Sequence, residues 1–519
     1  MISPSRFSIC CSHATLLKIC VIGLVCLPFL SFGRDVKIKV PNAYQDGKIL
    51  ATVFLQKAID SVSKSGGGYL MINRGTYLTG GLVLKKGVKL YLGSKAILLG
   101  STNPADYADH IPAYQNNMNR QSYKAMIYAE KAKGIGIVGS GLLDGQGDHE
   151  NFKFKGNQYT DRPFIVRFVD CKDVEVLGIK FTRAANWTQQ YQHCDAVVIK
   201  GIEVDCFSNR NNDGLDIDAS SNVLVEDCII HSDDDAICLK SSSKDACKDI
   251  AIRRCKVSSN CNAIKLGTAS IGGFRRISIS DITILPPKRA SHVWVRQWGL
   301  AGIALEIVDG GTLDDVRLED ITMQQVMTPI FIRLGDRGKG IDSVKLAQVG
   351  QLRNVTLRNI KATNLLRTVS SCIVGIPGHR VRDVLMENIT IEMPGGATIG
   401  DLKDTVPEVI AGYPENKMFG PMLPGSFLYL RHAEGVFIKD FKCMLKAEDA
   451  RPAIYFDDVV SAFLINFKSP APLNGYWMKA RNSNGIYLED CKAIGKPADV
   501  ISKVNTTNVF LEGVKVKAK

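Results

Sequence analysis

After residue 33 the sequence has no long hydrophobic run, and aromatic residues make up only 8% of the chain. The absence of such a run argues against a membrane-spanning helix in the rest of the protein. Glycine is frequent, at 46 residues, but it follows no three-residue period, so a collagen-like chain is excluded. No Cys-x-x-Cys cluster suggests a structural zinc site. With 45% hydrophobic and 23% charged residues, the chain is globular and not disordered.

Positive charge exceeds negative charge, with 65 Lys and Arg against 52 Asp and Glu, a net charge of +13. This balance suits a polyanionic partner, and it leaves nucleic acid, acidic polysaccharide and a membrane surface all open. At 519 residues the chain is too long for one ordinary compact domain. A barrel, a large sandwich or a repeat array would accommodate that length.

Residues 1–33 form the one long apolar stretch, with Arg6 and Lys18 as its only charged residues. Its run Ile19–Leu30 has the length of a signal-peptide core and is short for a membrane span. We predict a signal peptide over residues 1–33, hence a secreted or periplasmic protein without a membrane span in the mature chain. An uncleaved anchor is the alternative. Cleavage would lower the net charge to +11 and leave 11 of the 15 cysteines, which cannot all pair internally.

A short apolar pattern recurs along the chain. Two apolar residues stand two positions apart and a third follows three positions later, as in "DVEVLGI" from Asp173 and "NVLVEDC" from Asn222. Successive copies start with the apolar residues Val174, Val197, Val223, Ile250, Ile277, Val316 and Val355, and later ones with Val436, Phe463, Ile486 and Val509. The first five starts are 23, 26, 27 and 27 residues apart. A period of this length is typical of a solenoid.

Each copy is strand-like, because apolar residues alternate with polar ones and Asn, Asp and Gly bound the run. Long helical patterns between the copies are absent, which argues against alternating strands and helices. The repeat therefore predicts an all-β parallel β-helix, in which each strand pairs with the same strand one turn on, and a single domain over residues 34–519. The cysteines fall on repeat positions, which favours stacked buried thiols over a metal site.

The N-terminal end of a solenoid needs a cover. Apolar residues at helical spacing form one face, and a glycine run follows them at Gly66–Gly68. We predict a short N-terminal capping helix with its buried face made of Phe54, Leu55, Ala58, Ile59 and Val62.

A second strand follows about half a turn after most copies. It reads "DGLDID" from Asp213, "DAICLK" from Asp235, "NAIKLG" from Asn262, "AGIALE" from Ala301 and "TPIFIR" from Thr328. Alignment of these strands puts their outward residues into three columns. The columns are Asp213, Asp235 and Asn262; then Asp216, Cys238, Lys265, Ala304 and Phe331; then Asp218, Lys240, Gly267, Glu306 and Arg333.

Three carboxylates converge in this alignment. Adjacent turns of a β-helix are ~4.8 Å apart, so Asp213 and Asp235 would face each other with Asp234 beside them. Carboxylates so close repel, and the pKa of at least one should rise. A carboxylic acid that keeps its proton beside ionised carboxylates is the arrangement that glycoside hydrolysis needs. Solvated turn aspartates or a calcium site are the alternatives.

At these residues the sequence resembles glycoside hydrolase family 28, the polygalacturonase-like right-handed parallel β-helices. "NNDGLDID" (residues 211–218) is similar to the family's Asn-Thr-Asp-Gly motif, with Asn212 in place of Thr, and "SDDDAICLKS" (residues 232–241) to its paired-Asp motif. Four further segments are similar to family landmarks: "RGTYLTGGLVL" (74–84), "GSGLLDGQG" (139–147), "NWTQQYQHC" (186–194) and "YPENKMFG" (413–420). The resemblance covers roughly residues 40–460 and implies a right-handed coil.

The resemblance also implies roles for the carboxylates. Asp234 would be the general acid, and Asp213 and Asp235 would activate water for inversion, with no metal or organic cofactor. The substrate would be a pectin-type or other acidic plant polysaccharide or oligosaccharide. We expect no nucleic-acid partner and a monomer. The candidate substrate-binding residues are Asn211, Lys240, Asn262, Lys265, Glu306 and Arg333.

Two departures from the family pattern put plain homogalacturonan in doubt. The family's Gly-His-Gly motif corresponds to 261–263 (Cys-Asn-Ala), so its His is absent. Its Arg-Ile-Lys motif, whose cations help to bind a uronate carboxylate, corresponds to 304–306 (Ala-Leu-Glu). Lys240, Lys265 and Arg333 could replace the lost charge, and Glu306 suggests hydrogen bonds to sugar hydroxyls. A solvated solenoid face is the alternative for these four residues.

Two other classes of function stay open. A polysaccharide lyase would need a calcium site of acidic residues and a basic residue that takes a proton. A non-catalytic glycan-binding β-helix would need no clustered carboxylates. We favour the hydrolase.

Overall fold

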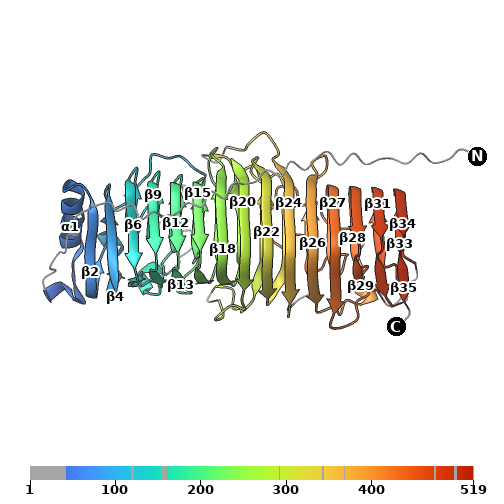
Figure 1. Ribbon diagram of the computed structural model, residues 1–519, viewed down its shortest axis with the longest axis horizontal. Coiled ribbons are helices and arrows are strands. Elements are labelled where there is room, and N and C mark those ends of the chain that lie inside the picture. Colours follow the sequence, from blue (N-terminus) through green and yellow to red (C-terminus); the bar gives the residue numbers. More distant parts are fainter. Residues whose placement is uncertain are drawn as a thin grey trace, which may run out of the picture.

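The computed structural model describes residues 42–117, 122–153, 161–291, 293–341, 344–366, 369–403, 405–472, 475–495 and 499–517. Its strands stack into a long rod, with the helix α1 at the N-terminal end (Figure 1). The predicted signal peptide, residues 1–33, lies outside the described residues. Within the described ranges, no helix combines the length and apolar character that crossing a bilayer would require.

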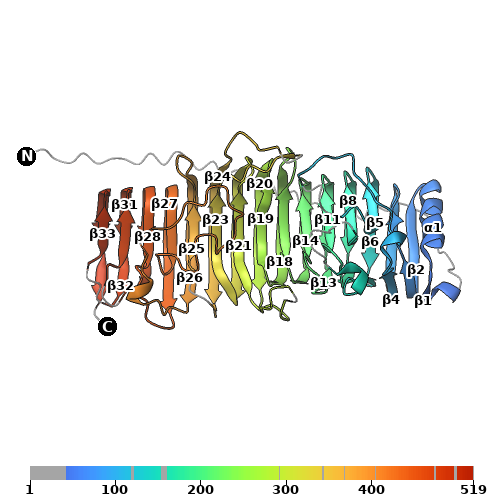
Figure 2. The same cartoon turned by 180° about the vertical axis from the view of Figure 1, so that it is seen from behind.

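Every pairing between the named strands is parallel, and each strand pairs with its counterpart one turn earlier and one turn later. The chain is thus a parallel β-helix with three faces, as the repeat predicts. Figure 1 looks onto the second face and Figure 2 shows the first face from behind. The right-handed sense of the coil stays a prediction.

The first face is built by the strands that the second-strand alignment predicts and by their counterparts in other turns. It contains β3 (Leu82–Val83), β5 (Ala125–Glu130), β8 (Phe164–Val169), β11 (Gln189–Gln192), β14 (Leu215–Asp218), β17 (Ile237–Ser241), β19 (Asn262–Ser270), β21 (Gly299–Ile307), β23 (Val326–Leu334), β25 (Ser371–Val374), the starts of β27 (Leu428–Leu445) and β28 (Ile454–Ile465), β30 (Met478–Arg481) and β33 (Ile501–Val504).

The second face contains the strands of the recurring apolar pattern, several of which continue round a corner into the third face. The second-face strands are β2 (Gly68–Thr79), β4 (Val88–Gly100), β6 (Lys133–Gly139), β9 (Lys172–Leu177), β12 (Asp195–Lys200), β15 (Ser221–Glu226), β18 (Cys247–Ser259), β20 (Gly273–Ile284), β22 (Thr312–Gln324), β24 (Gln351–Thr363), β26 (Val381–Met393), parts of β27 and β28, β31 (Asn484–Glu489) and β34 (Thr507–Glu512). The strands confined to the third face are β1 (Asp46–Leu50), β7 (Leu142–Asp144), β10 (Lys180–Thr182), β13 (Glu203–Cys206), β16 (Ile229–Ser232), β29 (Lys468–Pro470), β32 (Lys492–Ile494) and β35 (Lys515–Lys517).

The register of the second face confirms the predicted repeat over its first seven copies. Val174 pairs with Val197, and the pairing continues turn by turn to Val355. The residue before each start has a left-handed backbone, with φ of 55° at Asp173 and 53° at Asn222. Asp and Asn tolerate this conformation better than other residues with a side chain, which explains why they precede the apolar pattern so often.

The predicted start at Phe463 is wrong by one residue. Ala462 occupies the inward position that pairs with Val436 and Ile486, and it is fully buried. Phe463 points outward instead and is 37% exposed, with its ring stacked 4.6 Å from that of Tyr487. The larger apolar residue misled the alignment, because a period of two in a strand makes a one-residue shift exchange the two faces.

The helix α1 (Thr52–Lys64) forms where the helical pattern predicts it, and it buries Leu55, Ala58, Ile59 and Val62. It ends before a glycine run in which Gly67 has φ of +95° and lies so close to the next turn that a Cβ would be 2.7 Å from the Gly87 carbonyl oxygen. Only glycine fits that position without strain. The helix lies at the end of the stack (Figure 1), and its role as a cap stays a prediction.

The inward side chains of all three faces form one continuous apolar core along the rod. Cysteine thiols are part of it, as predicted. Of the 11 cysteines in the described residues, 10 are buried and one, Cys261, is partly exposed.

Candidate active site

The predicted columns form on the first face, except that the third is interrupted at Gly267, because the pairing of β17 with β19 shifts between Leu239 and Ser241. Asp216 pairs with Cys238, which pairs with Lys265, and the column continues to Ala304 and Phe331. Asp218 pairs with Lys240, and Glu306 with Arg333. These strands lie near the middle of the rod, where Figure 2 labels β14, β19 and β21; β17 lies between β14 and β19.

Three carboxylates come together at the start of β14 and β17. The Gly214 amide donates a hydrogen bond to the Asp235 carbonyl oxygen at 2.9 Å, which places Asp213 and Asp235 on adjacent turns. Both side chains are nearly buried, at 3% exposure, and Asp234 beside them is half-buried. Asp234 is therefore the member of the trio that is most open to solvent.

The turn before Asp213 is fixed by Asn212, the residue that stands where the family has Thr. Its Oδ1 accepts hydrogen bonds from the Ser208 and Asn209 amides at 2.8 Å, and its Nδ2 donates to the Ala184 carbonyl at 2.9 Å. Asn211 has a left-handed backbone, with φ of 60°, and its Oδ1 accepts a hydrogen bond from Arg162. Asn211 and Asn212 thus hold the loop that presents Asp213.

Lys240 lies beneath the trio rather than at the surface. Its Nζ is 3.0 Å from Asp216 Oδ1 and 3.6 Å from Asp213 Oδ2. The same ammonium donates to Cys238 Sγ at 2.9 Å and lies 4.6 Å from the ring centre of Trp187. With 5% of its surface exposed, Lys240 neutralises buried carboxylates and is not open to a polymer.

Asp235 is held by two neighbours from the next turn. Asn262 donates to its Oδ1 at 2.7 Å through the side-chain amide, and Lys265 Nζ lies 3.0 Å from Oδ2. Asn262 occupies the position of the His in the family's Gly-His-Gly motif, and its side-chain amide contacts the Asp235 carboxylate. Both partners favour the ionised form of Asp235.

The environments of the carboxylates separate their pKa values. Burial, together with the charges of Asp216 and Asp234, raises the pKa of Asp213 well above its usual range. Burial and the Asp235 charge raise the pKa of Asp234 to about 6. Burial opposes ionisation of Asp235 too, but Lys265, Lys240 and the Asn262 hydrogen bond outweigh it and lower that pKa. The predicted rise of at least one pKa therefore agrees with the structure, and Asp235 is the carboxylate that stays ionised.

The alternative of a solvated face for the four charged candidates is wrong. Lys240, Lys265, Glu306 and Arg333 are all outward from the coil, yet their exposure is 5%, 4%, 1% and 0%. Glu306 accepts a hydrogen bond from Thr268 Oγ1 at 2.9 Å, and burial raises its pKa to about 7. The outward direction followed from the strand period, but segments distant in sequence cover the face.

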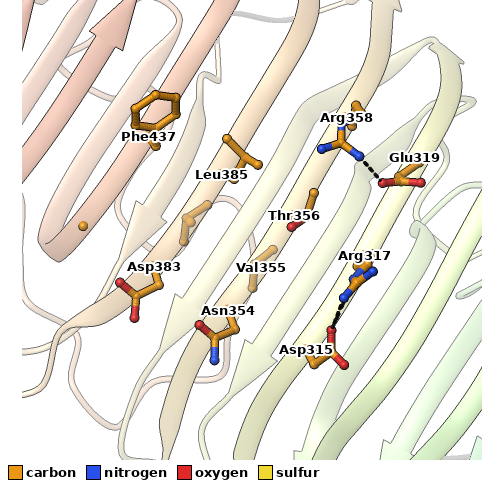
Figure 3. Close-up of a pocket in the computed structure, with 12 residues that line it drawn as sticks. Asp315, Arg317, Glu319, Asn354, Val355, Thr356, Arg358, Asp383, Leu385 and Phe437 are labelled. Carbon is orange, nitrogen blue, oxygen red and sulfur yellow. Dashed lines mark hydrogen bonds and ion pairs between the residues drawn. The ribbon is translucent and has the colours of Figure 1, made fainter. Parts of the chain in front are cut away.

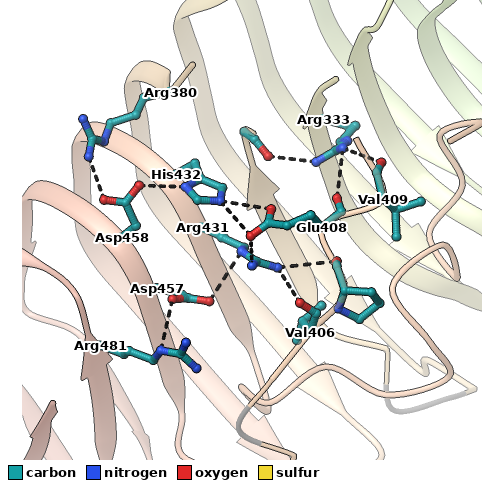
Figure 4. A network of polar contacts seen from close by, with 12 residues as sticks. Arg333, Arg380, Val406, Glu408, Val409, Arg431, His432, Asp457, Asp458 and Arg481 are labelled. Carbon is teal, nitrogen blue, oxygen red and sulfur yellow. Dashed lines mark hydrogen bonds and ion pairs between the residues drawn. The ribbon is translucent and has the colours of Figure 1, made fainter. Parts of the chain in front are cut away.

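Arg333 lies away from the carboxylates and holds the segment around Val409, which covers the first face. Its Nη1 donates to the Gly375 carbonyl at 2.8 Å and its Nη2 to the Val409 carbonyl at 2.9 Å (Figure 4). With its guanidinium buried against backbone oxygens, Arg333 does not offer a charge to the site.

A cation site within the cluster has three donors. Asp234, Asp235 and Cys261 offer ligand atoms within 4.8 Å of one another, the one such group among the residues that the structure describes. Calcium prefers six or more oxygen ligands, whereas this group includes a thiol, and Asp235 is already bound by the Lys265 ammonium. The residues present therefore do not fit the calcium site that a lyase would need.

Sequence reasoning did not single out three residues that the structure brings to the site. Asp216 pairs with Lys240, Cys261 lies beside Asp234 and Asp235, and Tyr413 lies 5.8 Å, ring centre to Nζ, from Lys265. The alignment contained Asp216. It stands two residues before Asp218, the strand-pairing partner of Lys240, so it lies on the same outward side of the sheet, which was a usable signal. The segment 413–420 is similar to a family landmark, but no local pattern predicted that Tyr413 lies against β19, because the two are about 150 residues apart in the chain.

Another hollow lies on the second face of the rod, with a volume of about 760 Å³ (Figure 3). Its two arginines are paired, Arg317 with Asp315 at 3.2 Å and Arg358 with Glu319 at 2.8 Å, and Asp383 lines it as well. Because its arginines already have carboxylate partners, we place the chemistry on the first face.

Comparison with known families identifies the family of the chain. The model of "Glycosyl hydrolases family 28" matches residues 85–407, more than half of the chain. The chain belongs to this family. It is therefore a glycosidase that hydrolyses O-glycosyl bonds, and the polygalacturonase-like resemblance found in the sequence is confirmed.

Curated relatives and solved structures point the same way. A "Probable polygalacturonase" from Vitis vinifera is 26% identical over 376 residues, 68% of this chain and 73% of the relative. An "Exo-poly-alpha-D-galacturonosidase" from Dickeya chrysanthemi is 22% identical over 429 residues, 72% of this chain and 70% of the relative. The structure of an exopolygalacturonase from Thermotoga maritima has a TM-score of 0.58 at 22% identity, covering 69% of this chain and 87% of that one. At that identity the structural likeness shows the fold alone.

Proposed function

We propose that this family 28 enzyme hydrolyses a glycosidic bond, with inversion, in a pectin-type or other acidic plant glycan. One observation carries the proposal: two neighbouring carboxylates are held in opposite protonation states. The pKa of Asp234 is raised to about 6 by burial and the Asp235 charge, whereas that of Asp235 is lowered by Lys265, Lys240 and Asn262 against the effect of burial. Acid and base therefore coexist at mildly acidic pH.

In this proposal Asp234, the more accessible carboxylic acid, donates its proton to the glycosidic oxygen of the leaving group. Asp235, kept ionised, orients a water molecule and takes its proton as the water attacks the anomeric carbon. Asp213 completes the trio that the family resemblance assigns to water activation. Its raised pKa gives it the role of a hydrogen-bond partner to that water, and Lys240 at 3.6 Å holds its position.

The substrate is proposed not to be plain homogalacturonan. The positions of the family's two uronate-binding cations are Ala304 and Glu306, and both are buried, at 0% and 1% exposure. Neither supplies a positive charge, and Glu306 is held by Thr268 instead of facing a sugar hydroxyl. Lys265 remains next to Asp235. A net charge of +13 suits a glycan that is acidic overall but offers a different or differently oriented residue at the cleavage position.

The alternatives are less well supported. A lyase would need calcium, and the donors near Asp234 suit it poorly for the reasons given above. A purely glycan-binding β-helix would have no need for buried carboxylates with opposed pKa shifts, which cost folding free energy. Secretion through the signal peptide, a single domain over residues 34–519 and a monomeric state remain part of the proposal.

The test is a screen of the purified protein on unbranched polygalacturonate, rhamnogalacturonan-type and other plant glycans, with product sizing and detection of unsaturated products. Hydrolysis of a branched or mixed acidic glycan, with no ultraviolet-absorbing product, is expected. Chelator-sensitive formation of unsaturated products would replace the proposal with the lyase. Binding without any change in glycan size would replace it with the binding protein. Efficient hydrolysis of polygalacturonate alone would refute the substrate assignment.

A further inference from the structure

The outward side of the second face carries a row of side chains that changes character along the rod. Strand pairing places one outward residue from each of seven successive turns in a single column: Arg317, Thr356, Leu385, Phe437, Phe463, Tyr487 and Phe510. The column follows the rod axis, and its last four turns are aromatic.

The rings at the C-terminal end of this column cover one another. The ring centres of Phe463 and Tyr487 are 4.6 Å apart, those of Tyr487 and Phe510 are 4.7 Å apart, and both pairs are almost parallel. Phe437 departs from this stack, because its ring centre is 6.2 Å from that of Phe463 and its plane is tilted by 33°. The neighbour of Phe437 on the preceding turn is Leu385, which has no ring. Phe437 therefore ends the aromatic series on the side that faces the middle of the rod.

The second-face hollow of about 760 Å³ begins where the aromatic series ends (Figure 3). Phe437 stands on one side of it and Arg317 on the other, with Thr356 and Leu385 between them. Adjacent turns are ~4.8 Å apart, so three steps separate the backbones of Arg317 and Phe437 by about 14 Å. The two side chains between them are shorter, and Gly435 beside Phe437 has none. The hollow is thus a gap in the column, open along the rod axis.

Planar polar groups line the two long sides of the hollow. On one side Arg358 pairs with Glu319 at 2.8 Å. On the other side three turns each contribute the left-handed residue that precedes a repeat start, namely Asp315, Asn354 and Asp383. Such groups donate and accept hydrogen bonds in pairs, which suits the neighbouring hydroxyls of a sugar. An aromatic ring next to them suits the apolar face of the same sugar.

The charge of the lining residues disfavours an acidic sugar. Two guanidiniums stand against three carboxylates, those of Asp315, Glu319 and Asp383. Each guanidinium already has a carboxylate within 3.2 Å. A uronate would bring a further negative charge to a lining whose two cations are paired, and like charges brought together weaken binding. Neutral sugars carry no such penalty.

We propose that the hollow between Arg317 and Phe437 is a non-catalytic binding site for neutral, hydroxyl-rich sugar residues of a glycan. The sugar rests its apolar face on Phe437, and the polar groups along the two sides bind its hydroxyls. The choice of a glycan as the occupant rests on the hydrolase function proposed above. A branched or mixed glycan can place neutral residues here while its acidic part occupies the first face, and the second contact raises the effective concentration of the polymer at the enzyme.

Affinity electrophoresis in gels that contain a soluble polymer tests the site. Asp234→Asn is the common background, because it leaves the polymer intact during the run. Phe437→Ala and Phe510→Ala form a matched pair, since both remove an outward ring from the same column but only Phe437 lines the hollow. We expect the Kd for neutral galactan or arabinan to rise about tenfold with Phe437→Ala and to change less than about twofold with Phe510→Ala. The difference should persist at high salt, because no charge on the ligand is involved.

Thr356→Phe is a second variant that keeps the test decisive if Phe437→Ala lowers stability. It fills the floor of the hollow with a residue that strands favour, leaves Phe437 in place, and should weaken binding of the neutral polymer as strongly. With Asp234 intact, all three variants should hydrolyse a short oligosaccharide of the substrate glycan at the wild-type rate, because the second face lies outside the catalytic machinery.

The possible outcomes separate this site from the proposed hydrolase function. Neutral polymers that do not retard Asp234→Asn, or equal Kd values for the two Phe variants and Thr356→Phe, would overturn the site and leave the hydrolase intact. Weaker binding of polygalacturonate alone would overturn the assignment to neutral sugars. A wild-type dimer in light scattering that Phe437→Ala abolishes would replace the glycan by a second copy of the chain. Galactan binding that depends on Phe437, without hydrolysis of any glycan, would support the site and refute the hydrolase.

Discussion

Two groups of buried charge lie on the first face of this β-helix, and they differ in balance. The site cluster in β14–β19 sets the carboxylates of Asp213, Asp216, Asp234 and Asp235 against two ammoniums. The anchor cluster near β27 and β28 sets three carboxylates against guanidiniums and an imidazole, with Arg431, His432 and Arg380 each on a carboxylate (Figure 4). The stacking geometry is the same, because both use residues repeated on adjacent turns.

The difference shows that, on the same β-helix, the ratio of cations to carboxylates decides whether a cluster anchors a segment or raises the pKa of its carboxylates. In the anchor cluster each carboxylate has a cation or imidazole within hydrogen-bonding distance, so the cluster ties one segment to another. In the site cluster there are more carboxylates than cations, so repulsion and burial must raise the pKa of some of them. Excess negative charge that is destabilising for the fold is what keeps a proton available for catalysis.

The largest expected effect breaks the site cluster. Asp234→Asn removes the proton donor without changing size, and we expect kcat to fall about 10²–10⁴-fold, the usual contribution of general acid catalysis. The melting temperature should not fall, because one repelling charge is removed. Asp227→Asn, an exposed turn aspartate in the same repeat, is the control and should retain activity. Near-normal turnover of an unactivated glycoside by Asp234→Asn would refute the assignment.

Breaking the anchor cluster should instead lower stability. Arg431→Met removes the nearly buried cation beside Asp457, whereas Glu408 is 34% exposed and keeps His432 as a partner. We expect a loss of about 1–3 kcal/mol in the free energy of unfolding, the usual cost of leaving one buried polar group unpaired. Denaturant titration measures it. Arg481→Met removes a guanidinium that is 37% exposed and 3.9 Å from Asp457, so the expected loss is below about 1 kcal/mol. Similar losses in the free energy of unfolding for the two variants would show that Arg431 contributes no more to stability than the partly exposed Arg481.

The pH profile sharpens the comparison within the site cluster. Hydrolysis needs Asp234 protonated and Asp235 ionised, and the pKa of Asp234 is raised to about 6 by burial and the Asp235 charge. We expect kcat/KM to fall about tenfold per pH unit above that value. The acidic limb should lie below the usual carboxylate range, because Lys265 and Lys240 outweigh the effect of burial on Asp235. A profile that is flat up to pH 8 would contradict the assignment of Asp234 as the acid.

The smallest expected effect concerns Glu306, a buried carboxylic acid without the cation of the family motif. Burial raises its pKa from 4.5 to about 7 in the folded protein. The unfolded chain ionises first, so the stabilisation by the neutral form is fully present below pH 4.5 and is lost as pH rises through 7. Glu306→Gln has no such loss. Between pH 5 and pH 8 the wild type should therefore lose on the order of 1–3 kcal/mol relative to Glu306→Gln in urea titrations. A difference independent of pH would show that Glu306 does not titrate in the fold.

Much of the fold was predictable because the repeat is local and periodic. The strand starts from Val174 to Val355 agree with the structure, and so does the helix with its buried Leu55 and Val62. The second-strand columns agree as well, apart from the break at Gly267. The error at Phe463 shows the limit of the method. Ala462 and Phe463 are both apolar, so the pattern alone could not decide which faces the core, and the packing of the narrow interior selected the smaller one.

The candidate site was predictable only in part. Register placed Asp213, Asp235 and Asn262 on adjacent turns, because parallel pairing repeats side chains at a fixed spacing. It gave no information on burial. The expectation of charged residues open to a glycan at Lys240, Glu306 and Arg333 fails because the segments that cover them come from elsewhere in the chain.

By itself the sequence determined the coil, the order of its faces and the convergence of Asp213, Asp234 and Asp235, since all three follow from a periodic pattern and from parallel stacking. Only the tertiary structure decided which carboxylates meet a cation, which stay repelled, and which part of the first face remains accessible. Pairing of Lys240 with Asp216 and closure by residues 405–427 depend on contacts between distant segments. Desolvation by those contacts, not the identity of the residues, separates the pKa values on which the chemistry depends.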